Sequence, residues 1–470
     1  MTLRLIDTLS GLQRELVPLE PGHVRIYSCG PTVYGPAHIG NFRSFLFADL
    51  LVRYLRYRGL RVTWVMNITD IDDKIIRGAA AKGISIGELA STWADRFVQD
   101  AAALRMSPPE VQPRATDHIP EMASLIGTLI ERGHAYRTAD GSIFFRIASW
   151  PAYGRLARLD PEQLRVGERV EADEYAKDDV RDFAVWKGPK AGEPSFDTAI
   201  GAGRPGWHIE CSAMSMKHLG ESFDIHTGAV DLIFPHHEDE LAQSEAATGK
   251  PFVQTWLHCA HLRMAGAKMA RSVGNIERVG DLLGKGVSAR ALRYVLIAVH
   301  YRAPLNYTDA SLVAAGSAIE RLDALLAALA AYRDERSDDP TLATLLATTR
   351  SAFEEALDDD LNIAPALAAL FDFIREINRR IDARTLSTAD ARIVTSFLHD
   401  LDRVLGIGPD PIDDQLGPDQ EALLEARAAA RTARNWAESD RLRDELAQRG
   451  IVVEDTRDGQ RWRRLEDLHG

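Results

Sequence analysis

Hydrophobic positions follow two different periods along the first 70 residues of the chain. Residues 23–29 are β-branched and aromatic, residues 41–59 carry apolar side chains at helical spacing, and residues 61–70 return to the first pattern. These patterns predict a strand, a helix that Gly59 ends, and a second strand. Such a βαβ unit implies a parallel sheet. Because parallel sheets bind ligands at the carboxyl ends of their strands, we expect a site there.

The rest of the chain divides by pattern into further units. Short pieces punctuated by Gly and Pro predict an inserted β-rich subdomain, and Ala/Leu-rich helical stretches predict an antiparallel bundle. A Gly/Pro/Asp linker at 406–420 precedes a predicted helix and hairpin. We therefore expect an α/β protein with a parallel-sheet domain at 1–113 and 203–275, an inserted connective segment at 114–202, a linker region at 276–311, a helical bundle at 312–405 and a small α+β domain at 421–470.

The composition of the chain excludes some classes of protein. The chain has 56 Lys and Arg against 69 Asp and Glu, a formal net charge of −13, which excludes a uniformly basic nucleic-acid coat. Any nucleic-acid contact must come from local basic patches. Three cysteines argue against a disulfide framework and for a reducing compartment. The N-terminal residues lack a signal-peptide pattern and no long apolar run occurs, so we expect a cytoplasmic protein without membrane partners.

The run FPHHEDELAQSE contains a first pair of candidate metal ligands. His236 and Glu240 are four residues apart, so a helix would place both on one face. By the same reasoning His237 and Glu238 are out of phase and should face elsewhere. A histidine and a glutamate at this spacing are more often a solvated helix face, so the pair alone is a weak indication.

Two cysteines could complete that pair. Cys29 and Cys211 each lie at the end of a predicted strand. Two thiolates, an imidazole and a carboxylate make a plausible four-ligand zinc set. A lone buried cysteine is usually a small hydrophobe, and Cys259 keeps that interpretation.

Two short stretches are suited to phosphate. The run HIGN opens the first predicted helix, whose N-terminus offers free N–H groups and a positive dipole end. Gly40 lets a flat ring approach the backbone, while His38 and Asn41 can donate hydrogen bonds to phosphate oxygens. The later run KMARSVGN contributes Lys268 and Arg271 to a loop that could close on a pyrophosphate leaving group. Such a loop alone is usually solvated surface, but together the two stretches predict a nucleotide site.

These stretches resemble the HIGH and KMSKS motifs of class I aminoacyl-tRNA synthetases. Together with YSCGPTVYGPAHIGN, NITDIDDKII, RPGWHIECSAM, FPHHEDELAQSE and NWAESDRLRDELAQRGIVVEDTRDGQRWRR they resemble cysteinyl-tRNA synthetase over essentially the whole chain. The resemblance implies a Rossmann-type catalytic domain with a connective insertion, a tRNA-binding helical bundle and a C-terminal anticodon domain. It implies a monomeric ligase that activates L-cysteine with ATP, forming cysteinyl-adenylate, and transfers it to tRNA(Cys).

The resemblance also implies cofactors and residue roles. One Zn²⁺ per chain would select the cysteine thiolate over the serine hydroxyl, and Mg²⁺ would accompany ATP. The implied sets are, for the metal, Cys29, Cys211, His236 and Glu240; for ATP, His38, Gly40, Asn41, Gly228, Lys268 and Arg271, of which His38, Asn41, Lys268 and Arg271 are also catalytic; and for the amino acid, Thr69, Trp207 and Asp231. The plain alternatives are that Trp207 is a core residue and Asp231 a helix cap.

For tRNA, the candidates lie in the last 50 residues. Trp436 could stack on an anticodon base, with Arg431 and Asp440 near it on the same predicted helix. Asp455 and Arg463 belong to the predicted hairpin and complete the set. The alternative is an ordinary amphipathic terminal domain.

The sequence departs from the family pattern at three places, and two competing hypotheses remain. Asn41 replaces the second histidine of HIGH, Thr227-Gly228-Ala229 stands where three glycines are usual, and Arg271 replaces the second lysine of KMSKS. A related ligase that joins cysteine to a small amine should lack the C-terminal domain. A non-catalytic paralogue would be supported only by the altered ATP loop. Pyrophosphate exchange and tRNA charging separate these hypotheses.

Overall fold

A computed structural model of the chain describes residues 2–159, 181–264, 266–268, 276–409, 418–449, 451–456 and 459–464. The chain divides into two units, Met1–Gly408 and Pro409–Gly470, and each is described by itself. None of the helices within the described ranges is both long and apolar enough to cross a membrane.

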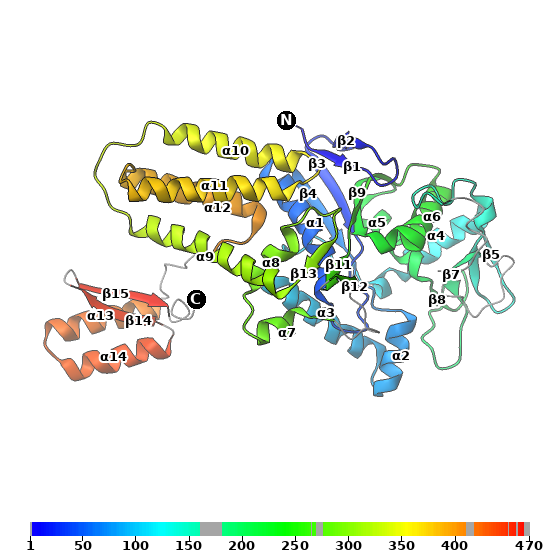
Figure 1. Ribbon diagram of the computed structural model, residues 1–470. Helices are drawn as coiled ribbons and strands as arrows, with labels where there is room; N and C mark the ends of the chain where they lie inside the picture. The colour runs from blue at the N-terminus through cyan, green and yellow to red at the C-terminus, as the bar shows by residue number, and fades with distance from the viewer. Residues whose placement is uncertain are drawn as a thin grey trace. The chain divides into compact units, whose positions relative to one another are not determined.

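Four parallel strands form the central sheet of the larger unit (Figure 1). In the order β10-β9-β3-β4 they are β10 (Val253–Cys259), β9 (Phe223–Ala229), β3 (His23–Ser28) and β4 (Arg61–Met66). Helix α1 (Ile39–Tyr57) connects β3 to β4, so the predicted βαβ unit and its parallel sheet are confirmed. Cys29 and Asn67 follow directly where β3 and β4 end.

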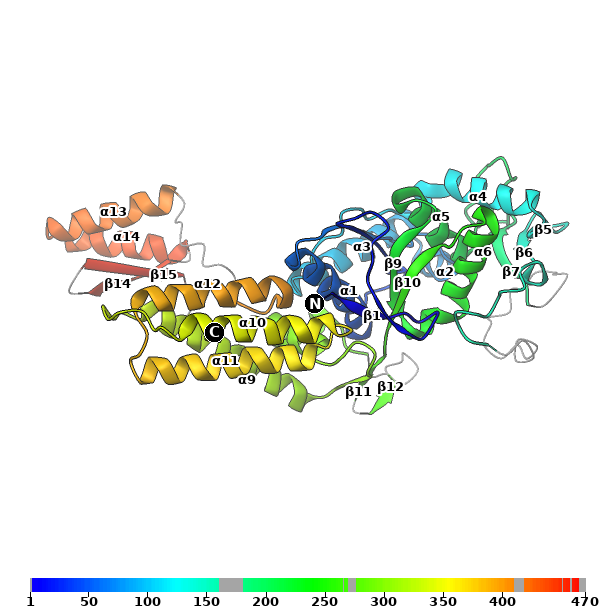
Figure 2. The same ribbon diagram turned by 90° about the horizontal axis from the view of Figure 1, so that it is seen from above.

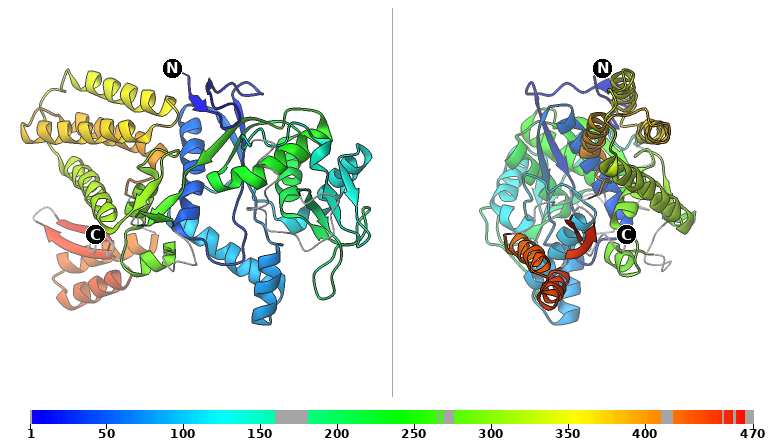
Figure 3. Two further views of the ribbon diagram at one scale, coloured as in Figure 1. Left: turned by 45° about the vertical axis from the view of Figure 1, so that its right-hand side comes forward. Right: turned by 90° about the vertical axis from the view of Figure 1, so that its left-hand side faces the viewer.

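Both faces of the sheet are covered, as Figure 3 shows for the blue helix α1 and the green helix α5. Ile26 packs into a core shared with α1, whereas the next residue, Tyr27, packs into a core shared with three other helices. Successive strand residues point to opposite faces, which is why the strands are apolar throughout. The three helices of the second core are α4 (Ile119–Glu131), α5 (Trp207–Leu219) and α6 (Glu238–Thr248).

The insert and the helical bundle lie on opposite sides of this sheet (Figures 1 and 2). The insert contains an antiparallel sheet in the order β5 (Ala135–Arg137), β6 (Ile143–Phe145), β7 (Phe183–Lys187) and β8 (Arg204–Pro205). The punctuated pattern predicted a β-rich segment at 114–202 but not the helix α4, and the sheet takes in β8 just beyond the predicted bound, so we count β8 with the insert. The bundle consists of α9 (Asp309–Ala331), α10 (Leu342–Asp358), α11 (Ile363–Asp382) and α12 (Thr388–Leu405).

Shorter elements connect these parts. They are the hairpin β1 (Arg4–Ile6) and β2 (Gln13–Glu15), the helices α2 (Asp73–Lys82), α3 (Ile86–Ala103), α7 (Val279–Gly284) and α8 (Ala289–Ile297), and the strands β11 (Leu262–Met264), β12 (Ala267–Lys268) and β13 (Leu305–Tyr307). Strand β11 pairs with both β12 and β13, so the start of the KMARSVGN run is held in a small sheet of its own.

The described part of the smaller unit contains the helices α13 (Pro418–Thr432) and α14 (Trp436–Gln448) and the predicted hairpin, β14 (Ile451–Thr456) with β15 (Gly459–Arg464). The sequence predicted Arg431 and Trp436 on one helix, and this is wrong. Arg434 adopts a φ of 57°, and the Asn435 side chain caps α14 by accepting from the Glu438 N–H. Arg431 therefore lies in the last turn of α13, whereas Trp436 begins α14, with Asp440 one turn later.

Candidate active site

Four buried side chains with metal-binding atoms meet near the carboxyl ends of β3 and β9. The Cys29 Sγ lies 3.6 Å from the Cys211 Sγ and 3.5 Å from Glu240 Oε1. Nε2 of His236 lies 3.0 Å from the same Glu240 oxygen. One donor atom from each of the four residues lies within 4.8 Å of those of the other three. The structure thus brings together all four residues that the sequence suggested as metal ligands.

Two details of that suggestion are wrong. Cys211 lies within α5 and not at the end of a strand; nearly every residue from Ile209 to Ser215 is buried, so this helix shows no polar face that a periodicity could reveal. His236 precedes α6 in an irregular turn, where Phe234 has non-helical backbone angles. The turn nevertheless directs the His236 imidazole onto Glu240 in the first turn of α6.

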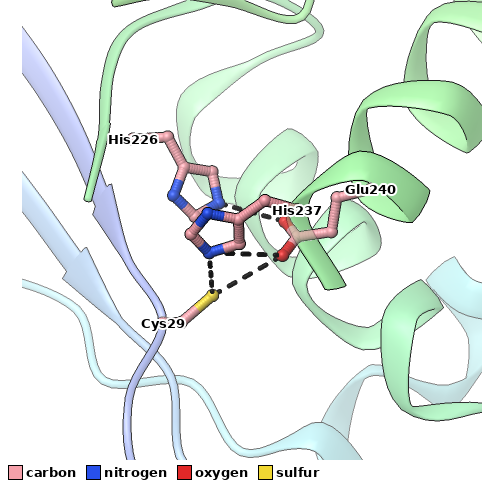
Figure 4. A group of neighbouring side chains, drawn as sticks. All are labelled: Cys29, His226, His237 and Glu240. Carbon is pink, nitrogen blue, oxygen red and sulfur yellow. Dashed lines mark hydrogen bonds and ion pairs between the residues drawn. The ribbon is translucent and has the colours of Figure 1, made fainter. Parts of the chain in front are cut away.

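Two further histidines reach the same carboxylate, and one of them also reaches the Cys29 thiol (Figure 4). His237 Nε2 lies 3.3 Å from the Cys29 Sγ and 4.0 Å from Glu240 Oε1, so the prediction that His237 faces elsewhere is wrong. Residues three apart share a helix face just as residues four apart do. Nε2 of His226, on β9, lies 3.0 Å from Glu240 Oε2. Cys29, His226, His237 and Glu240 therefore form a second candidate donor group.

Glu238, the other residue predicted to face elsewhere, does so. Its carboxylate accepts hydrogen bonds from the backbone N–H groups of Gly154 at 2.7 Å and Ala157 at 2.9 Å. Glu238 thus anchors the insert. Glu240, two residues later, belongs to the group of Cys29, Cys211, His236 and Glu240, which we call the metal-type cluster. His226 was missed from the sequence, because no strand was predicted at residues 223–229 and its partner Glu240 lies on a different element.

Electrostatic effects bias the cluster toward an ion pair. Burial alone would raise the pKa of Glu240, but His226 and His236 outweigh it and lower that pKa to about 2. Burial likewise opposes the charged form of His236, yet Glu240 raises its pKa to about 10. Burial raises the pKa of Cys29, whereas the hydrogen bond from Cys29 lowers that of Cys211 to about 6 against the effect of burial. Without a metal, the site therefore holds a His236 imidazolium against a Glu240 carboxylate.

The HIGN turn forms a reciprocal cap at the start of α1. The Asn41 N–H donates to His38 Nδ1 at 3.1 Å, and the His38 N–H donates to Asn41 Oδ1 at the same distance. Because Nδ1 accepts, the neutral imidazole carries its proton on Nε2, which can donate outward. The Ile39 N–H donates to the Glu277 carbonyl, and the backbones of His38 and Arg278 pair in an isolated antiparallel β-bridge. The chain that follows KMARSVGN thus lies beside this turn.

The basic loop itself is only partly described. Lys268 ends β12, but its side chain, like Arg271 as a whole, lies outside the described residues. Gly228 is buried at the end of β9, where an added Cβ would lie 2.5 Å from His237 Cε1. Close approach of that imidazole is a packing reason for glycine at 228, independent of any contact with ATP.

A cavity of about 360 Å³ opens next to the cluster. Trp207 lines it and stacks on His236 with ring centroids 4.2 Å apart, while remaining 37% exposed, which argues against a purely structural role. Thr69 is buried, and its hydroxyl donates to Glu210 Oε2 at 2.9 Å. Asp231 is exposed in a short turn after β9. Neither Thr69 nor Asp231 is among the described residues that line the cavity.

In the smaller unit, Trp436 is 56% exposed and the Arg431 guanidinium lies 5.7 Å from its ring centroid. Asp440 is exposed on the same helix as Trp436. Asp455 lies on β14 and Arg463 on β15, and their side chains lie outside the described residues. An exposed tryptophan with an arginine against it is a suitable surface for stacking on a base.

Comparison with known families decides the affiliation. Residues 15–317 match the family described as "tRNA synthetases class I (C) catalytic domain", and residues 413–463 match "Cysteinyl-tRNA ligase anticodon binding domain". The chain belongs to the cysteine–tRNA ligase family. Residues 352–408, in the bundle, match the "DALR domain".

Relatives match along the entire chain. A cysteine–tRNA ligase of Solibacter usitatus is 45% identical over 466 residues, covering 99% of this chain and 100% of the relative. The one from Halorhodospira halophila is 46% identical over 470 residues, covering 98% and 99%. These matches confirm the family that the quoted runs indicated.

Solved structures support the fold. Mycobacterium tuberculosis methionyl-tRNA synthetase in complex with methionyl-adenylate aligns with a TM-score of 0.58 at 18% identity, over 82% of this chain and 90% of that one. An Agrobacterium radiobacter LeuRS in a ternary complex aligns with a TM-score of 0.59 at 12% identity, over 83% and 85%. At these identities the likeness shows the fold alone, and it confirms the predicted Rossmann-type class I architecture.

Proposed function

We propose that this cysteine–tRNA ligase selects cysteine through a zinc ion held by Cys29, Cys211, His236 and Glu240. The observation that carries the proposal is the burial of these four donors in one cluster against the Trp207 cavity. Membership of the family supports the reaction itself, in which cysteine is activated with ATP and joined to tRNA.

The donor set fits zinc. Two thiol sulfurs, one imidazole nitrogen and one carboxylate oxygen are ordinary zinc ligands, and zinc held by four protein donors can take a fifth ligand from a substrate. The separations Cys29–Cys211, Cys29–Glu240 and His236–Glu240, 3.0 to 3.6 Å, suit donors around an ion about 2.0–2.3 Å from each, and all four donors lie within 4.8 Å of one another. The alternative group with His226 and His237 offers only one thiolate, so a soft metal favours the set with Cys211. When bound, Zn²⁺ supplies a centre that prefers the substrate thiolate to a hydroxyl.

The protein's other residues position the reactants. His38 Nε2–H and the Asn41 amide would donate to ATP phosphate oxygens at the α1 N-terminus, with Gly40 allowing close approach of the nucleotide. Lys268 and Arg271 would neutralise charge on the leaving pyrophosphate as the cysteine carboxylate attacks the α-phosphorus. Mg²⁺ would accompany ATP in the usual way.

The amino-acid pocket and the tRNA contacts complete the proposal. Trp207 would form a wall beside the substrate, Thr69 would support that pocket from behind, and Asp231 would meet the substrate ammonium or the ribose hydroxyls. In the smaller unit, Trp436 would stack on an anticodon base. The remaining candidates for tRNA are Arg431, Asp440, Asp455 and Arg463.

The test combines metal analysis with two activity assays. Purified protein should contain one zinc per chain, support cysteine-dependent pyrophosphate exchange, and charge tRNA with cysteine. Cys211→Ala should lose the metal, whereas Cys259→Ala should keep it, because Cys259 is buried in the other core with its Sγ near the Arg43 carbonyl. Full zinc retention in Cys211→Ala would contradict this ligand set, and exchange without charging of any tRNA would favour a small-amine ligase.

A further inference from the structure

Asp73 links the catalytic domain to the insert beside the amino-acid cavity. It is the first residue of α2, and it follows the loop that carries Thr69. Its Oδ2 accepts from Lys187 Nζ at 2.8 Å, and its Oδ1 accepts from Arg204 Nη2. Lys187 ends β7 and Arg204 begins β8, so one carboxylate from the catalytic domain holds two strands of the insert.

The neighbouring acids in this loop have other tasks. Asp70 accepts hydrogen bonds from the backbone N–H and the hydroxyl of Thr116, at the entrance to the insert. Asp72 caps α2 by accepting from the Lys74 N–H at 2.6 Å. Among the three acids of this loop, Asp73 alone is bound to the insert's sheet.

Without Asp73 the end of that sheet would place two like charges together. Lys187 and Arg204 are directly opposed in the antiparallel ladder, an arrangement that is unfavourable between like charges. Their side chains are only 13% and 5% exposed, so solvent screens them poorly. Glu193 also binds Arg204, at 2.8 Å, but no hydrogen bond or ion pair between Glu193 and Lys187 occurs among the described contacts. Asp73 is thus the carboxylate that both cations share.

Both cations are coupled to the cavity. Lys187 lines it, as does Asp73 itself. Arg204 leads through Pro205 and Gly206 to Trp207, the wall that stacks on His236. Gly206 is pressed against β7, since an added Cβ would lie 1.9 Å from the Ala184 carbonyl oxygen. A shift of β8 is therefore transmitted directly to Trp207.

We infer that Asp73 is a positioning residue for amino-acid binding, which fixes Lys187 and Trp207 around the cavity by holding the ends of β7 and β8. The inference rests on the proposed function, because it assigns that cavity to cysteine. Asp73 acts through its two cationic partners and not by touching the reacting atoms. Its removal should weaken cysteine binding selectively while leaving the phosphate site intact.

The experiment is cysteine-dependent pyrophosphate exchange with full-length protein. Asp73→Asn should raise the KM for cysteine about tenfold, because one charge-assisted hydrogen bond at a half-exposed carboxylate corresponds to roughly that factor. The kcat, the KM for ATP and the zinc content should stay within about twofold of wild type. Asp73→Glu, which keeps the charge, should recover most of the affinity. Lys187→Gln should raise the same KM, and combining it with Asp73→Asn should add little.

Two variants serve as matched controls. Glu121→Gln breaks the 2.9 Å ion pair with Lys217, which also joins the insert to the catalytic domain but away from the cavity. Glu193→Gln removes the second partner of Arg204. Both should leave the KM for cysteine within about twofold.

The inference is overturned by an unchanged KM for cysteine in Asp73→Asn, by an equal rise in Glu121→Gln, or by multiplicative effects in the double variant. Should Asp73→Asn not fold, an unchanged KM in Lys187→Gln overturns it instead. A wild-type protein that shows no cysteine-dependent exchange refutes the proposed function, which is a separate outcome.

Discussion

Replacing Glu240 with glutamine tests the electrostatics at the centre of the cluster. In metal-free protein the Glu240 carboxylate, helped by Cys211, holds the His236 imidazolium and raises its pKa from 6.5 to about 10 against the effect of burial. A folded-state pKa above the unfolded value stabilises the protein fully below pH 6.5, and the effect is lost as the pH rises toward 10. At pH 7 the folded-state pKa of His236 lies about 3 units above the pH, which corresponds to about 4 kcal/mol of stabilisation. At pH 9 it lies about 1 unit above the pH, which corresponds to about 1.4 kcal/mol.

The carboxylate gives a second measure of the same interaction. Lowering the Glu240 pKa from 4.5 to about 2 corresponds to about 3 kcal/mol, present above pH 4.5 and lost as the pH falls toward 2. Because the two figures describe one pair, they are not added, and we take 3–4 kcal/mol. For a unit of about 400 residues this lowers the melting temperature by about 4–5 °C at pH 7.

The assay is thermal unfolding of chelator-treated wild type and Glu240→Gln at pH 7 and pH 9. The difference in melting temperature should shrink by more than half at pH 9. Glu238→Gln is the matched control, because that carboxylate is buried on the same helix but binds backbone N–H groups, which do not titrate in this range. A Glu240→Gln difference that is the same at both pH values would refute the ion-pair reasoning.

Three further predictions follow from the site and from the division into units. Chelation of the metal should lower activation of cysteine far more than activation of serine, measured by pyrophosphate exchange; equal losses would make the metal structural. Gly228→Ala should lower stability by about 1–3 kcal/mol in thermal unfolding, because its Cβ would lie 2.5 Å from the His237 ring, and an unaltered melting curve would contradict that packing. Ending the chain after Gly408 should preserve exchange but raise the KM for tRNA, with Trp436→Ala alone causing part of the rise, about 5- to 150-fold; unchanged charging would show that the anticodon is not bound there.

Contiguous patterns were the predictable part of this molecule. The βαβ unit, the parallel sheet and the helical bundle follow from hydrophobic periods, because each strand or helix buries a continuous face. The HIGN turn is recognisable for a similar reason, since the cap that His38 and Asn41 make is local in sequence. Those features need only a few neighbouring residues to specify them.

Features that depend on packing between distant segments were harder to predict from the sequence. Helix α5 is buried on nearly every side around Cys211, so its sequence lacks the polar face that distinguishes a helix from a strand. His237 was assigned the wrong direction because only a four-residue spacing was considered. His226 could be recognised as a partner of Glu240 only once β9 was known to lie next to β3 in the sheet.

Cys29 of the metal-type cluster and His38 of the HIGN turn lie on one short segment of the chain. Cysteine is short, so its sulfur and its carboxylate can reach two sites only if these lie close together. The segment from Cys29 to His38 is fixed by the loop that follows β4. The Gly30 N–H donates to Asn67 Oδ1, the Val33 N–H donates to the Thr69 carbonyl, and the Thr69 N–H donates to the Pro31 carbonyl. The Asn67 oxygen also lies 3.8 Å from the Cys211 Sγ. One loop therefore holds the segment between the metal-type cluster and the start of α1, and under the proposed function lengthening it would separate the two ends of cysteine from their partners.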